Sequence, residues 1–98
     1  MTPNETIQEV MCWLGINHIA STQSQLSRDV DKVVSLLPED GTEIQIKDLR
    51  AGLNAYGFDI QYQNQILKET GQNHRDIRAR RNSYEHENSI DKIYLRRL

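Results

Sequence analysis

Amide and lysine side chains gather on one side of a short segment in the second half of the chain. Projected at 100° per residue, residues 60–70 place Ile60, Ile66 and Leu67 on an apolar side and polar residues opposite. Glutamine and asparagine can pair bidentately with adenine in the major groove, and lysine can meet guanine or phosphate. The alternative is an ordinary solvated helix, although such helices more often carry Glu–Lys pairs. The candidate base-reading residues are Gln61, Asn64, Gln65 and Lys68.

Basic residues flanking a polar loop near the C-terminus offer a second chemistry. Guanidinium groups grip phosphate, and a narrow minor groove also attracts cations. The competing role is protection of an exposed strand edge by charge, and for the two basic residues at 47 and 50 it is ordinary surface charge. Glu85 and Glu87 in the loop would repel phosphate, which favours contact by the flanking strands over contact by the tip. The candidate phosphate-binding residues are Lys47, Arg50, Arg75, Arg78, Arg80, Arg81, Lys92, Arg96 and Arg97.

Residues for catalysis or metal binding do not occur at workable spacings. Cys12 and His18 are six positions apart, and His74 and His86 are twelve apart, and neither spacing is a recognised metal site. The sequence has no nucleophile elbow, no glycine-rich phosphate loop and no carboxylate pair with a basic partner. We therefore expect no catalytic residue, no metal, no cofactor and no enzyme activity.

Helices must position the amide face, and local signals bound them. Apolar residues at i, i+3, i+4 and i+7 predict helices in both halves of the chain. Thr2 and Pro3 start the first helix, and Pro38 stops the second. Gly15, Gly57 and Gly71 are expected to end helices, and Asp59 is expected to cap the last one. The predicted helices cover residues 2–14, 22–37, 47–57 and 60–70.

Strands are predicted where apolar and polar side chains alternate at every second position. Residues 43–46 alternate polar and apolar side chains before the third helix. Residues 76–80 place Ile77 and Ala79 on one face and two arginines on the other, and residues 92–96 alternate again. The polar loop between them makes a β-hairpin with a long tip.

This order of elements, from residue 24 onward, resembles the winged helix-turn-helix family. The resemblance rests on the strand at 43–46, the two helices joined by a Gly-Phe-Asp turn, and the basic hairpin. It implies an α+β, mainly α fold: a winged helix-turn-helix with an additional N-terminal helix and a C-terminal β-hairpin wing. The expected single domain spans residues 1–98, with an N-terminal helical extension at 1–21, a helical core at 22–73 and the wing at 74–98.

In that family the second helix of the pair enters the major groove and the wing lies along phosphates. The resemblance therefore assigns base reading to the amide face and phosphate binding to the basic residues. The implied function is sequence-specific binding of double-stranded DNA. The chain would act as a small transcriptional regulator or as the origin-binding domain of a mobile-element replication protein.

The N-terminal helix carries more apolar surface than a minimal winged helix needs. One interpretation is that it caps the core. The other is a homodimer, because small DNA-binding domains gain affinity and site length by pairing. The candidate dimer-interface residues are Ile7, Val10, Met11 and Leu14.

Charge and composition bound the partners. The net charge is −2, with −5 over residues 1–46 and +3 over residues 47–98. The negative total favours a rival class, a winged-helix protein–protein interaction module such as a phage-encoded inhibitor of a host complex. A single cysteine excludes an internal disulfide, and no apolar run approaches the roughly 18 residues of a membrane span. We expect a cytoplasmic protein with no membrane partner.

Overall fold

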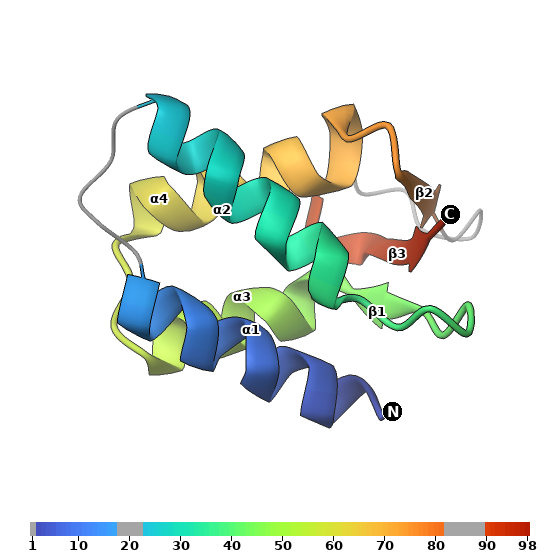
Figure 1. The fold of residues 1–98 in the computed structure, drawn as a ribbon, viewed down its shortest axis with the longest axis horizontal. Helices are drawn as coiled ribbons and strands as arrows, with labels where there is room; N and C mark the ends of the chain where they lie inside the picture. The colour runs from blue at the N-terminus through green and yellow to red at the C-terminus, as the bar shows by residue number, and fades with distance from the viewer. Residues whose placement is uncertain (1, 18–22, 82–89) are drawn as a thin grey trace.

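A three-stranded antiparallel sheet lies at one end of a mainly helical chain (Figure 1). The computed structural model describes residues 2–17, 23–81 and 90–98. The predicted α+β class is confirmed, and the architecture is compatible with a small winged-helix-like fold. Along the described ranges, no helix has both the length and the apolar character needed to cross a membrane. In chain order the elements are α1 (Pro3–Asn17), α2 (Gln23–Leu36), β1 (Ile44–Gln45), α3 (Ile46–Ala55), α4 (Ile60–Lys68), the π-helical turn η1 (Glu69–Asn73), β2 (Ile77–Arg81), the 3-10 turn η2 (Ile90–Lys92) and β3 (Ile93–Arg97).

The first helix begins where its cap predicts but ends later. Thr2 Oγ1 accepts a hydrogen bond from the Glu5 backbone N–H at 3.2 Å, which satisfies one of the free donors of the first turn. The predicted end at Gly15 is wrong, because α1 continues to Asn17. Asn17 Nδ2 donates to the backbone oxygen of Trp13 at 2.9 Å, so a side chain satisfies a carbonyl of the last turn.

Gly71 serves close packing and does not end a helix. α4 passes at Lys68 into η1, and in the described ranges only Gly41 and Gly57 have positive φ. A Cβ built on Gly71 would lie 2.6 Å from Cδ1 of Ile46, which is fully buried at the start of α3. The predicted helix end at Gly71 is therefore wrong, and the close approach of Ile46 is what requires glycine there.

The strand order is β1-β3-β2, with β3 in the centre. Ile44 of β1 lies opposite Leu95, and Arg78 of β2 lies opposite Arg96. Because side chains alternate along a strand, Leu95 and Ile93 turn into the core while the two arginines share the other face. The predicted alternation is confirmed, although β2 and β3 each begin one residue later than expected and β1 is shorter.

The apolar face of α1 completes the core. α1 packs against α2 and α3 (Figure 1). Val10, Met11 and Leu14 are each 1% exposed, and Ile7 is partly buried against the same cluster. Val10, Met11 and Leu14 do not form the predicted dimer interface, because their own chain already covers them, whereas the part of Ile7 that stays exposed leaves its role in an interface a prediction. The alternative interpretation, in which the helix caps the core, is confirmed.

Trp13 lies between α1 and two cations of α2. The Arg28 guanidinium carbon is 5.5 Å from the centroid of the indole ring, and Lys32 Nζ is 5.8 Å from it. Cations at these distances are attracted to the face of an aromatic ring. The contact adds a polar attachment to the apolar packing of α1 on α2.

We expect Gly71→Ala to lower the free energy of unfolding by about 1–3 kcal/mol, because the new methyl group overpacks the site beside Ile46. Urea unfolding followed by circular dichroism would measure the change. Ile46→Val removes the Cδ1 atom that the methyl group would meet. The loss caused by Gly71→Ala should therefore be smaller in the Ile46→Val background. Equal losses in the two backgrounds would show that the contact is not the cause.

Candidate nucleic-acid interface

The turn between α3 and α4 orients the second helix of the pair. Gly57 has a φ of 80°, and the Phe58 N–H donates to the Leu53 carbonyl at 3.0 Å, so the chain leaves α3 through a left-handed residue. Asp59 Oδ2 accepts from the Tyr62 N–H at 3.4 Å, which caps α4. The predicted roles of Gly57 and Asp59 are confirmed. Local backbone bonds therefore fix the direction in which α4 leaves the turn.

α4 has a buried face and an exposed polar face. Its buried residues are Tyr62, Gln63, Ile66 and Leu67. Ile60, predicted on the apolar side, is instead 60% exposed, because it is the first residue of the helix and lies ahead of the turn that meets the core. Apart from Ile60, every exposed side chain of α4 is an amide or a lysine. These exposed residues are the four predicted to read bases, Gln61, Asn64, Gln65 and Lys68.

A buried hydrogen bond anchors α4 to α2. The Tyr62 hydroxyl donates to Asp29 Oδ2 at 2.8 Å, and the two residues are 6% and 1% exposed. Burial, together with the hydrogen bond and negative charge of Asp29, raises the pKa of the Tyr62 phenol far above its usual value. The phenol therefore stays protonated and keeps its bond. Since Tyr62 faces the core, it is not available to stack on a base.

Arg50 is held by a network that joins α3, α4 and η2. Its Nε donates to Asp91 Oδ1 and Oδ2 at 2.8 and 3.0 Å. Its Nη1 donates to Asn64 Oδ1 at 2.9 Å and to Gln63 Oε1 at 3.5 Å. The side chain is 20% exposed. Arg50 was expected to bind phosphate or to be ordinary surface charge; in this structure protein acceptors engage its Nε and Nη1, and phosphate binding stays a prediction.

The outer face of the sheet, which we define as the face carrying Arg78, Arg80, Tyr94 and Arg96, concentrates positive charge. Arg78 and Arg96 lie directly opposite each other, and the positive charge of Arg96 also acts on the Glu43 carboxylate. Arg80 stacks on Tyr94, with 4.5 Å between the guanidinium carbon and the ring centroid, and donates to both carboxylate oxygens of Glu43 at 2.8 and 2.9 Å. The bond from Arg80 holds the pKa of the Glu43 carboxyl below its usual value.

Two other hairpin arginines lie on the opposite face. Arg97 pairs in register with Ile77, and Arg81 pairs with Ile93, so both alternate with the residues of the outer face. Arg97 Nη1 also lies 3.2 Å from Glu39 Oε1. These two predicted phosphate ligands therefore cannot share one contact surface with the outer face.

The remaining predicted phosphate ligands are spread over the surface. Arg75 has a 91% exposed side chain and lies 3.8 Å from the Asp76 carboxylate. Lys47 is exposed in the first turn of α3, and Lys92 is the last residue of η2. The predicted hairpin tip, with its two glutamates, lies outside the described residues.

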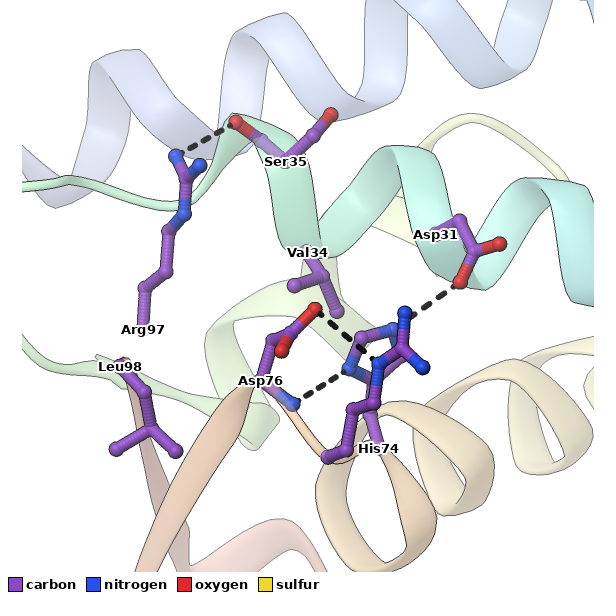
Figure 2. A pocket seen from close by; sticks show the side chains of 8 residues that line it. Asp31, Val34, Ser35, His74, Asp76, Arg97 and Leu98 are labelled. Atoms are coloured by element: carbon purple, nitrogen blue, oxygen red, sulfur yellow. Dashed lines mark hydrogen bonds and ion pairs between the residues drawn. The ribbon is translucent and has the colours of Figure 1, made fainter.

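A polar hollow of about 590 Å³ lies where α2, the link between η1 and β2, and the end of β3 meet (Figure 2). His74 Nε2 is 3.1 Å from Asp31 Oδ1, and His74 Nδ1 accepts from the Asp76 N–H at 3.1 Å. A neutral ring with its proton on Nε2 satisfies both contacts. From the far side of the hollow, Arg97 Nη1 donates to the Ser35 carbonyl at 3.1 Å (Figure 2). These bonds attach the start of β2 and the end of β3 to α2.

Metal chemistry finds no support in the described ranges, where no three His, Cys, Asp or Glu side chains lie close enough together to hold an ion. Cys12 is exposed and free. Comparisons with protein-family models, with curated proteins and with solved structures gave no match to this chain. Function must therefore be argued from the surface itself.

Tyr62→Phe should lower the free energy of unfolding by about 1–3 kcal/mol, because Asp29 stays buried after losing a hydrogen-bond donor. Thermal or urea unfolding would measure the loss. Tyr56→Phe is the matched control, since Tyr56 is 58% exposed, and it should change stability by less than about 0.5 kcal/mol.

The pH dependence of the same difference is a second readout. Folding raises the pKa of Tyr62, so its contribution is complete below the unfolded value of about 10 and is lost as the pH rises toward the folded value. The stability difference between the wild type and Tyr62→Phe should shrink above about pH 10. A difference that stays constant there would contradict the assignment of the bond.

Proposed function

We propose that this chain is a winged helix-turn-helix domain that binds double-stranded DNA sequence-specifically through α4. The observation that carries the proposal is the exposed face of α4, where three amides and one lysine stand together without an acidic residue. Such groups match the donors and acceptors that base pairs present in the major groove. An α-helix with side chains is about 10–12 Å across, and the major groove of B-DNA is about 12 Å wide.

The topology supports the same architecture. Of the four described α-helices before the hairpin, α2, α3 and α4 would correspond to the helical core of a winged helix, and α3 and α4 are joined by the short turn at Gly57. The strand before α3 joins the hairpin in the order β1-β3-β2. In this arrangement the hairpin packs against η1, which continues α4, and would act as a wing in reach of the DNA backbone.

The outer face of the sheet supplies a reason to expect phosphate there. Like charges directly opposite each other on paired strands repel. Arg78 and Arg96 are such a pair, and a bound phosphate between them would turn the repulsion into two charge-assisted contacts. Arg80 is already paired with Glu43 and would contribute less. We therefore assign the main phosphate contact to Arg78 and Arg96.

The biological setting consistent with this site is a small transcriptional regulator or the origin-binding domain of a mobile-element replication protein. Both need recognition of a short duplex site and no chemistry from this domain. The direct test is selection from random duplex DNA at two salt concentrations. A recovered motif, with affinity that falls as salt rises, is expected. Failure to bind any duplex at low salt would refute the proposal.

Arg78→Ala and Arg96→Ala should each weaken binding to all DNA sequences alike and reduce the slope of log affinity against log salt by about one unit. Titrations of labelled duplex over a range of salt would measure both effects. Arg97→Ala is the matched control, because Arg97 lies on the opposite face and is held by Glu39. A salt slope unchanged in the first two variants would remove the outer face from the contact.

A protein-interaction module is the second candidate function. It is favoured by the acidic residues that pair with Arg50, Arg75, Arg80 and Arg97 and so reduce the basic surface. Many DNA-binding domains are basic overall, and this chain is not. The low-salt titration separates the two candidates, since only the DNA binder responds to duplex.

A further inference from the structure

One side chain links the exposed face of α4 to the base of the hairpin. Arg50, on α3, reaches Asp91 of η2 with Nε and Asn64 of α4 with Nη1, at 2.8 and 2.9 Å. A guanidinium group is planar and rigid, so binding Nε to the Asp91 carboxylate also fixes the direction in which Nη1 points. The position of the Asn64 contact is therefore set by two other elements of the fold.

This contact determines which way the Asn64 carboxamide faces. A guanidinium group donates hydrogen bonds and cannot accept them, so the Asn64 atom that faces Arg50 is the oxygen. The Nδ2 amide of this exposed side chain then points away from Arg50. Gln63 is oriented in the same way, since its Oε1 faces Arg50 and its Nε2 donates to the Phe58 carbonyl at 2.9 Å.

We propose that Arg50 and Asp91 are positioning residues that preset Asn64 for base recognition, and that Arg50 is not a phosphate ligand. This inference rests on the proposed function, because a preset amide matters only if a base edge is read. A free asparagine side chain samples several rotamers, and ordering it at an interface costs free energy. In this chain folding has already ordered it, so the discrimination at one base pair depends on a residue that does not touch DNA.

The two possible roles of the network predict different results for Asp91→Ala. If the network acted only by charge, removing the Asp91 carboxylate would free Arg50 for phosphate and strengthen binding to every duplex. If the network positions Asn64, Asp91→Ala releases the guanidinium and relaxes the preference at one base pair. The acidic residue therefore distinguishes positioning from simple electrostatics.

The experiment is selection from random duplex DNA with the wild type, Asn64→Ala, Asp91→Ala and Arg50→Lys, after thermal unfolding has shown that each is folded. Lysine keeps the charge but cannot donate from two separate nitrogens in one plane. The base pair at which Asn64→Ala loses its preference should be the one relaxed in the other two variants. The expected loss of discrimination there is roughly tenfold, with the salt slope unchanged.

Asp48→Asn is the control for a change of charge on the same helix, since Asp48 is exposed and belongs to no predicted DNA contact, and the DNA motif recovered with it should stay unchanged. Stronger binding of Asp91→Ala to every duplex, with a steeper salt slope and an intact motif, would overturn the positioning role and leave DNA binding standing. Full preference at that base pair in Arg50→Lys would also overturn the positioning role. Failure of the wild type to bind any duplex would overturn the proposed function, and the positioning role with it.

A measurement without DNA tests the geometry itself. Relaxation of the side-chain amide nitrogen by NMR should show a restricted Asn64 in the wild type and a mobile one in Arg50→Lys and Asp91→Ala. The exposed Gln65 amide is the internal control and should be mobile in all three proteins. Equal mobility of Asn64 and Gln65 in the wild type would overturn the proposal.

Discussion

The pairing of β1 with β3 is the contact on which the rest of the arrangement depends. Ile44 and Leu95 lie opposite each other, are almost fully buried, and come from positions half a chain apart. Because α3 starts at the residue after β1, this short pairing fixes the origin of α3 against the hairpin. The left-handed Gly57 then directs α4, and Arg50 of α3 comes within reach of η2. The pairing of Ile44 with Leu95 thus fixes where α3 and α4 lie relative to the hairpin.

Ion pairs between distant elements help to hold the helices and the hairpin in this arrangement. Arg50, Arg80 and Arg97 each join elements distant in the sequence, to Asp91, Glu43 and Glu39. The Arg50 pair is partly buried and makes several hydrogen bonds, so solvent screens it less than an exposed pair. The other pairs are more open and contribute less each. Fewer basic side chains are therefore open to a partner, among the described residues, than the number of Lys and Arg in the sequence indicates.

Local chemistry made much of this fold predictable. The Thr2 cap, the Gly57 and Asp59 turn and the alternation in β2 and β3 all depend on residues within a few positions of one another. The exposed amide face of α4 followed from helical periodicity alone, and its exposure is confirmed. Its use in reading bases stays a prediction.

The features that the sequence did not reveal depend on distant contacts. Gly71 looks like a helix end until Ile46 is placed beside it, and the apolar face of α1 has the same composition whether its own core or a second chain covers it. Arg50 and Asp91 are 41 positions apart, and only the strand register brings them together. No local spacing could have shown that Arg50 is engaged.

The placement of Trp13 gives the chain an optical reporter of its own assembly. It is the only tryptophan, and its indole lies between α1 and the cations Arg28 and Lys32 of α2. Indole emission depends on solvent contact and on nearby charge, so the fluorescence of this chain reports on one helix pair and not on an average over the fold. Detachment of the N-terminal helix would therefore be visible as a spectral change even while the sheet and α4 remain intact.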